Sequence, residues 1–274
     1  MEASFIRKKE GKMRIIIMTD LEGTAGVVDF ETQTYPEGKY FEKAKELLTE
    51  EVNAACEGLS EEGVDEILIV DGHGPGGILP EKIHPKAKLL HGRPVPIYWE
   101  IDKNWDGLFL LAHHSMNGTE NGNLNHTFSS KNIVRMVLNG EEIGEIGMHI
   151  YLAGHFGIPA LLISGDLAAC NEAERYVKNI EKAVVKWGIN RTCAISLSPS
   201  ASRSLIKEKA KIAIRRISEI KPVKIEGECE LIIEYISSSL AYSVSKRPDR
   251  ELITPTKVRI KGKDFLEIWR KFVY

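Results

Sequence analysis

Acidic residues and histidines follow apolar segments at several points in the first half of the chain. The candidates are Asp20, Glu22, His73, His114 and Glu145. Four of them come just after a predicted β-strand, and Glu145 lies at the start of a predicted helix. Because the carboxyl ends of strands in an open parallel sheet meet at one edge, these side chains are expected to converge. Two imidazoles and three carboxylates at such an edge favour a divalent metal site, with zinc as the preferred ion.

Asp20 and Glu22 stand two positions apart at the end of the apolar run IIIMT. Residues at this spacing in an extended chain point to the same side, and two carboxylates held together repel each other unless a cation lies between them. The segment Gly23 to Gly26 would let the backbone turn sharply around such an ion. An ordinary strand-end turn with solvated acids is the alternative.

The histidines are less decisive on their own. His73 lies in the glycine-rich segment DGHGPGG, which leaves space for a ligand or a metal. A phosphate-binding loop would need a lysine at the Walker spacing, which is absent, and an incidental turn histidine is a further alternative. His113 and His114 follow LFLLA, and only one of the pair can point toward the strand ends.

A long polar segment, SMNGTENGNLNHTFSS (115–130), follows this pair and contains His126. Long loops in compact domains are usually functional, and a histidine beside a metal centre can serve as an acid or base; a solvated loop histidine is the alternative. His149 lies one helical turn after Glu145, so both share a helix face, but this spacing is common by chance. Asp166 is expected to support the site or to cap the following helix.

The elements that must position these residues alternate along the chain. Apolar β-branched runs predict parallel strands, and apolar residues at helical spacing predict the helices between them. The expected strands are 13–19, 66–70, 87–90, 108–112, 160–164 and 193–197, and the expected helices are 41–59, 145–155 and 172–186. Strand, helix and strand in this order form right-handed crossovers. The expected fold class is therefore α/β, a three-layer sandwich with a mostly parallel sheet.

The pattern changes after residue 197. Further elements are expected there: a helix over 203–220, a strand over 224–235, a short helix, a strand over 257–262 and a helix over 264–272. We therefore predict a metal-binding catalytic α/β domain over 1–197 and a small C-terminal α+β domain over 198–274. The last residues are apolar and aromatic, which suits either an interface or packing against the main domain.

The composition excludes several classes of function. The chain of 274 residues is 43 % hydrophobic and 28 % charged with a net charge of −2, so nucleic acid and membrane are not expected as partners. No run approaches the roughly 20 apolar residues that a membrane helix needs. The four cysteines form no CxxC pair, so reduced thiols and a cytoplasmic location are expected. The first twelve residues are polar and basic and are expected to form a loose leader, or to result from a start site placed upstream of Met13.

Together the motifs resemble those of the zinc-dependent D-aminopeptidase family of self-compartmentalising bacterial peptidases. The resemblance covers nearly the whole chain after Met13. Its landmarks are, in order, D-x-E-G at 20–23, D-x-H at 71–73, the histidine at 114, G-x-x-x-H at 122–126 and G-E-x-G at 144–147. The S-G-D at 164–166 and the segment 193–199 also fit. Any one landmark alone would be weak, whereas five in order are specific.

The resemblance implies two zinc ions per chain and a hydrolase that removes the N-terminal residue of short peptides, especially those containing D-amino acids. Asp20 would bridge the ions. Glu22 and His73 would hold one ion, and His114 and Glu145 the other. His126 would be the catalytic residue. The implied assembly is a ring-shaped homo-oligomer, typically a decamer of two five-fold rings.

Two other functions fit parts of the sequence. The segment TDLEGT also resembles the first motif of the haloacid-dehalogenase phosphatases, in which Asp20 would be the nucleophile and Mg²⁺ the cofactor. That family has Asp where this chain has Glu22, and its scheme gives the histidines no role. A non-enzymatic metal-binding protein is the second alternative, and it would have no use for His126.

Overall fold

The computed structural model describes residues 11–95 and 104–273, so most of the expected leader lies outside the described residues. Within them, the larger sheet has seven strands in the order β3-β2-β1-β4-β7-β8-β9. All neighbouring strands are parallel except β8 and β9, which are antiparallel. The strands are β1 (Arg14–Thr19), β2 (Glu66–Asp71), β3 (Ala87–Leu90), β4 (Gly107–His113), β7 (Ala160–Asp166), β8 (Glu181–Asn190) and β9 (Cys193–Ser196).

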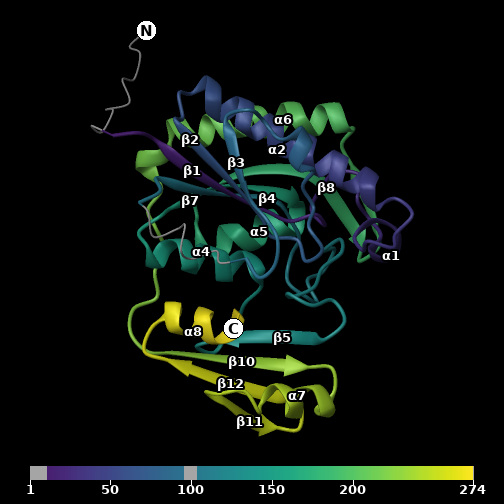
Figure 1. The fold of residues 1–274 in the computed structure, drawn as a ribbon, viewed down its shortest axis with the longest axis vertical. Coiled ribbons are helices and arrows are strands. Elements are labelled where there is room, and N and C mark those ends of the chain that lie inside the picture. The colour runs from purple at the N-terminus through teal and green to yellow at the C-terminus, as the bar shows by residue number, and fades with distance from the viewer. Residues whose placement is uncertain (1–10, 96–103, 274) are drawn as a thin grey trace.

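Helices cover both faces of this sheet, which makes the three-layer α/β sandwich that the sequence predicted. Helices α2 (Phe41–Glu61) and α6 (Pro199–Arg215) lie together on one face. Helices α4 (Glu145–His155) and α5 (Leu167–Tyr176) lie on the other (Figure 1). The short helix α1 (Phe30–Gln33) follows the turn after β1.

The chain reverses its direction of travel across the sheet at β1. From β1 it moves through β2 to β3, and it then returns to β4 on the other side of β1 before continuing to β7 and β8. Thr19, the last residue of β1, pairs with Asp71 of β2 and with Leu111 of β4. The carboxyl ends of these three strands therefore lie side by side at a topological switch point, where ligands bind in open α/β sheets.

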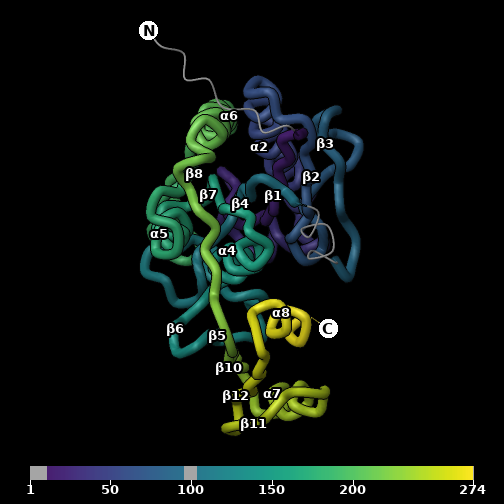
Figure 2. Tube along the Cα trace, turned by 90° about the vertical axis from the view of Figure 1, so that its left-hand side faces the viewer, coloured from purple at the N-terminus to yellow at the C-terminus, as the bar shows by residue number. Residues whose placement is uncertain are grey.

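A second, antiparallel sheet lies below the first and has the order β11-β12-β10-β5-β6 (Figures 1 and 2). Its strands are β5 (Ile133–Leu138), β6 (Glu141–Glu142), β10 (Cys229–Tyr235), β11 (Arg250–Thr254) and β12 (Lys257–Gly262). Helices α7 (Ser238–Val244) and α8 (Phe265–Val273) accompany it. Two of the strands, β5 and β6, come from within the span 1–197, so this sheet draws on both sides of the boundary predicted at residue 197.

Most expected elements appear close to their predicted limits, but the helix expected over 172–186 is wrong in its second half. Helix α5 ends at Tyr176, and residues from Glu181 form strand β8. Ala183 and Val185 are buried while Val184 is partly exposed. This two-residue alternation belongs to a strand, and the charged residues that flank it made the segment resemble an amphipathic helix.

The aromatic end of the chain packs inside the molecule. Phe265 and Trp269 of α8 are buried, and their rings lie 5.7 Å from Tyr151 and 5.5 Å from His149 of α4. Phe128 contacts Trp269 and Phe272 from the segment before β5. Of the two alternatives that the sequence left open for this end, the structure shows packing against the main body.

Two expectations from composition can be compared with the described residues. No helix among them combines the length and apolar character that crossing a bilayer requires. All four cysteines carry free thiols; Cys56, Cys170 and Cys229 are buried and Cys193 is exposed.

The close approach of α4 to the segment before β10 generates a stability prediction. A Cβ on Gly154 would lie 1.7 Å from the carbonyl oxygen of Val223. Gly154→Ala should therefore destabilise the protein by about 1–3 kcal/mol through overpacking, against the gain of about 1 kcal/mol that alanine normally brings to a helix. Urea unfolding measures the difference. Gly11→Ala, whose Cβ meets nothing within 4 Å, is the control, and a Gly154→Ala protein as stable as the wild type would contradict the prediction.

Candidate metal centre

A tight turn after β1 carries Asp20 and Glu22 and is held against the end of β4. The amide of Asp20 donates to the carbonyl of Leu111 at 2.9 Å, and the amide of Gly23 donates to the carbonyl of Ala112 at 2.7 Å. A Cβ on Gly23 would lie 2.2 Å from backbone atoms of Ala112 and His113. The glycine of the D-x-E-G segment thus lets the acidic turn lie directly against the strand that ends in the histidine pair.

The first group of candidate ligands comprises Asp20, Glu22 and His73. His73 Nδ1 lies 3.3 Å from Asp20 Oδ1 and 3.1 Å from Glu22 Oε2. The other ring nitrogen, Nε2, donates to the carbonyl of Thr34 at 2.9 Å. That bond assigns the proton of the neutral imidazole to Nε2, so the Nδ1 lone pair faces the carboxylates in the arrangement typical of metal-binding histidines.

The second group comprises Asp20, His114 and Glu145. His114 Nε2 lies 3.0 Å from Asp20 Oδ2 and 3.3 Å from Glu145 Oε1. His114 Nδ1 donates to the carbonyl of Ser115 at 2.9 Å, which again leaves the facing nitrogen with its lone pair. Glu145 is held by the amide of Phe128, which donates to its Oε1 at 2.7 Å. The two oxygens of Asp20 therefore face different histidines, one in each group.

The arrangement fits a cation. Asp20, Glu22, His73 and His114 are all buried. Asp20 Oδ2 and His114 Nε2 lie 3.0 Å apart, yet neither has a hydrogen-bond partner among the described residues. Two acceptors this close, both shielded from water, are unfavourable alone and favourable as ligands of one ion. Two sets of three ligand atoms, each set within 4.8 Å, lie at this place; the sets are Asp20, Glu22 and His73, and His114, His126 and Glu145.

The electrostatics point to the same requirement for positive charge. Burial opposes the ionised form of Asp20, but the imidazoles of His114 and His73 outweigh it and hold the Asp20 pKa well below its usual range. Burial likewise opposes a charge on His114, while Glu145 and Asp20 raise the His114 pKa well above normal. The cluster favours a positive charge among its carboxylates, which either protons or a metal ion would supply.

His126 lies beside the second group. Its Nε2 is 3.8 Å from Glu145 Oε1, and its ring stacks on that of His114 with centroids 3.9 Å apart and planes 16° apart. Its Nδ1 donates to the carbonyl of Leu124 at 2.9 Å. Burial and the neighbouring His114 lower the pKa of His126. A neutral imidazole with a free Nε2 lone pair at this place can accept a proton or coordinate an ion.

The other two candidate histidines lie away from the ligand cluster. The rings of His113 and His149 approach each other at 5.8 Å, and His149 packs against Trp269. Burial lowers the pKa of both, that of His149 to about 4. The structure thus separates His114 from His113; Ala112, directly before the pair, is left-handed (φ 60°) where the pairing of β4 with β7 shifts register. His113 and His149 are neutral packing residues between β4, α4 and α8.

The long polar segment 115–130 is folded tightly over the cluster. Asn123 and Leu124 are fully buried, and the amide group of Asn125 donates to the carbonyls of Thr119 and Gly122. Asn125 therefore satisfies backbone groups inside the loop, whereas Asn117 and Asn123 bond to the carbonyls of Val134 and Arg191 outside it. Asp166 caps α5 by accepting from the amide of Ala169 at 2.8 Å, as the sequence predicted.

Two buried charged residues near the cluster were missed from the sequence. Glu172 accepts from the amide of Met116 at 2.7 Å, and burial raises its pKa to about 7. Lys186 is fully buried in β8. Lys186 breaks the alternation of Ala183 and Val185, because the pairing of β7 with β8 shifts register between Gly165 and Asp166, so strand periodicity does not predict its burial.

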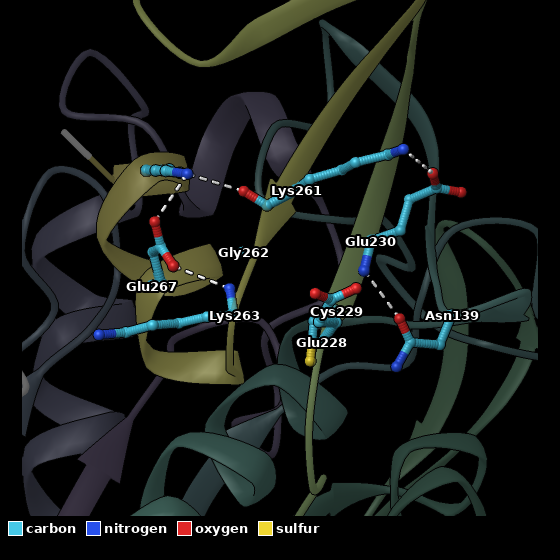
Figure 3. A pocket seen from close by; sticks show the side chains of 9 residues that line it. Asn139, Glu228, Cys229, Glu230, Lys261, Gly262, Lys263 and Glu267 are labelled. Atoms are coloured by element: carbon cyan, nitrogen blue, oxygen red, sulfur yellow. Dashed lines mark hydrogen bonds and ion pairs between the residues drawn. The ribbon is translucent and has the colours of Figure 1, made fainter.

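A cavity of about 530 Å³ lies elsewhere, beside β10, β12 and α8 (Figure 3). Its charged residues neutralise one another: Lys271 pairs with Glu267 at 2.8 Å, and Lys261 approaches Glu230 at 3.9 Å. None of its lining residues belongs to the ligand cluster, so this cavity is not part of the candidate metal centre.

The chain is similar to known proteins over nearly its whole length. Residues 13–274 match the family model of the M55 peptidases, described as D-aminopeptidase. The chain is 29 % identical over 262 residues to a D-aminopeptidase of Bacillus subtilis, with 94 % of each chain covered. The fold is similar to that of the Zn-dependent D-aminopeptidase DppA from Bacillus subtilis, a self-compartmentalizing protease. That match has a TM-score of 0.89 and 28 % identity, and it covers 95 % of this chain and 96 % of the other.

The shared position of Asp20 generates a prediction about metal content. Asp20→Ala should remove most of the bound metal from both ligand groups, because Asp20 is the side chain that faces both His73 and His114. Elemental analysis of the dialysed protein measures this. His149→Gln, which alters a buried histidine outside the cluster, should keep its metal. Full metal content in Asp20→Ala would contradict the bridging role.

Proposed function

Since the chain belongs to the D-aminopeptidase family of M55 peptidases, we propose that it is a zinc-dependent aminopeptidase that removes the N-terminal residue of short peptides, including peptides of D-amino acids. One observation carries the proposal beyond family membership. The two oxygens of Asp20 face the free nitrogens of two histidines, each of which is fixed by a backbone carbonyl on its far side. That is the donor arrangement expected for two ions sharing one carboxylate.

We assign the ligands accordingly. Asp20 would be shared by two zinc ions, with Glu22 and His73 holding the first and His114 and Glu145 holding the second. Bound zinc would lower the pKa of a water molecule toward neutrality and polarise the peptide carbonyl. Nitrogen and carboxylate ligands of this kind suit zinc.

His126 is assigned the catalytic role rather than a place among the ligands. Its ring stacks on that of His114 with planes 16° apart, and its Nε2 lies 3.8 Å from Glu145 Oε1, beside the two residues assigned to the second ion. The carbonyl of Leu124 fixes the proton on Nδ1, which leaves Nε2 to take a proton from the attacking water and pass it to the leaving amine. Its lowered pKa keeps this nitrogen unprotonated and ready to accept.

The two alternative functions fit the site less well. A phosphatase nucleophile needs a carboxylate oxygen free to attack, whereas both oxygens of Asp20 face imidazoles. A protein that only binds metal would not require a neutral, oriented imidazole such as His126 beside the ligands. Family membership and geometry together favour the peptidase.

We further propose that the enzyme is a cytoplasmic homo-oligomer, with a decamer of two five-fold rings as the expected form. The related Bacillus subtilis enzyme is described as self-compartmentalizing, and the four free thiols suit a reducing compartment. Phe265, Ile268 and Trp269 of the C-terminal helix are buried within the chain and are not free to form an interface. Exposed apolar residues are instead found on β8 and β9, where Trp187, Ile189 and Ile195 reach solvent.

Replacing the catalytic histidine tests the proposed chemistry. His126→Ala should keep the fold and the metal but lower kcat by about two to four decades, the usual contribution of an acid or base. The assay uses D- and L-aminoacyl p-nitroanilides, with p-nitrophenyl phosphate as the test of phosphatase activity. His84→Ala, which alters a histidine paired with Glu57 at 3.2 Å, is the control. Unchanged activity in His126→Ala would make His126 a bystander, and phosphate-ester hydrolysis without peptidase activity would overturn the proposed function.

The assembly has its own test. Light scattering should show a species of about ten chains, since closed cyclic symmetry leaves no unpaired interface. Inward-facing active sites would make kcat/KM fall steeply with peptide length. A monomer in solution, or efficient trimming of a folded protein, would be incompatible with an enclosing ring.

A further inference from the structure

Lys186 is a charged side chain with no water contact and no place among the proposed ligands. It lies in the middle of β8 and is fully buried. A lysine is almost never buried to this extent unless its ammonium group is paired. The groups that pair with Lys186 therefore show which parts of the fold it stabilises.

The ammonium group binds oxygens from two separate segments that form the candidate centre. It donates to the carbonyls of Glu22 and Val27, which belong to the turn after β1; the Val27 distance is 2.6 Å. It also donates at 2.8 Å to the side-chain oxygen of Asn123, in the polar segment 115–130. All three donor positions of an ammonium group are thus used. Lys186 thus forms hydrogen bonds both with the turn that contains Glu22, a proposed zinc ligand, and with the segment that contains His126.

Asn123 connects Lys186 to the residues that orient His126. Its backbone amide donates to Asp166 Oδ2 at 2.7 Å, and its side-chain amide donates to the carbonyl of Arg191 at 3.2 Å. The next residue, Leu124, is fixed by its own bond to Arg191 and accepts from His126 Nδ1 at 2.9 Å. The carbonyl that orients the His126 ring therefore belongs to the residue directly after Asn123, which Lys186 holds.

The three oxygens, and not a direct ion pair, hold the Lys186 ammonium group. Burial lowers the pKa of Lys186 to about 8, against the acidic groups Asp166, Glu51, Glu22 and Asp20, which raise it. A flexible four-carbon chain ending in a compact cation can reach three oxygens that diverge from different segments. An apolar side chain here would leave these oxygens buried without a donor, which is unfavourable.

We propose that Lys186 is a positioning residue that sets His126 at its working distance from the metal centre, through Glu22 on one side and Asn123 on the other. This inference rests on the proposed function for its kinetic consequence only. The physical link between the turn and the segment 115–130 is independent of what the enzyme hydrolyses. Misplacing a catalytic group by about 1 Å can cost about a hundredfold in rate, so the effect should fall on kcat.

The experiment compares two ways of breaking the link with a matched control. Lys186→Met removes the ammonium group and keeps most of the side-chain length, and Asn123→Ala removes the acceptor on the His126 side together with the amide bond to Arg191. Lys182→Met is the control, since Lys182 lies on the same strand but binds Glu174 in a partly exposed pair. If Lys186→Met fails to fold, Asn123→Ala carries the test alone.

The first readout needs no substrate. Hydrogen exchange measured by mass spectrometry should show faster exchange of peptides within 115–130, by about tenfold or more, in Lys186→Met and Asn123→Ala. Zinc content should stay at the wild-type level in both, and Lys182→Met should match the wild type throughout. Unchanged protection of 115–130 in Asn123→Ala would overturn the link, whether or not the enzyme proves to be a peptidase.

The second readout is kinetic. Each variant should lower kcat by about 10–100-fold with KM within about threefold of the wild type. Combined with His126→Ala, either variant should cause little further loss, because residues that act through one group are not additive. Full multiplication of the two effects, or a loss of thermal stability with kcat unchanged, would show a structural role alone and overturn the positioning role. Absence of peptidase activity in the wild type would refute the proposed function and leave the exchange result standing.

Discussion

The burial of three carboxylates in one small volume is the constraint on which this structure depends. Asp20 and Glu22 are almost fully shielded, and Glu145 approaches them across His114. Charges of one sign held together in a low dielectric repel strongly unless positive charge lies between them. The nearby histidines do not relieve this repulsion while neutral, because backbone carbonyls hold their protons on the far side. The site is therefore built for cations, and the surrounding fold keeps the acids together in spite of their repulsion.

The fold meets this constraint with its most rigid parts. The strand-end positions of β1, β2 and β4 are fixed by hydrogen-bonded pairing in the centre of the sheet, and Gly23 brings the acidic turn against β4. A site assembled on strand ends is held more precisely than one assembled on free loops. The segment with His126 belongs to a long connection. Dense hydrogen bonding and the buried Lys186 hold it in place.

The sequence predicted the parts of this site that depend on local order and missed those that depend on contacts between distant segments. Apolar runs ending in acids or histidines located the strand ends, and the order of elements placed those ends together. The choice between His113 and His114 could not be made from the residues, because the left-handed Ala112 directly before the pair interrupts the regular strand geometry. The partners of Lys186 come from segments more than 60 positions away, and no local pattern reports them.

The second sheet contains strands from both sides of the boundary predicted at residue 197, because its pairing joins segments that are distant in the sequence. The crossover from β4 to β7 contains, in order, the His126 segment, β5, β6 and then α4 with Glu145 at its first turn. Strand β5 has β6 on one side and needs β10 from the C-terminal region on the other. Helix α8 then packs against α4 and Phe128. The C-terminal region thus completes a sheet whose other members connect His126 to Glu145. It is not merely appended to the catalytic body, since it anchors the connection between two of the residues that the proposed chemistry requires.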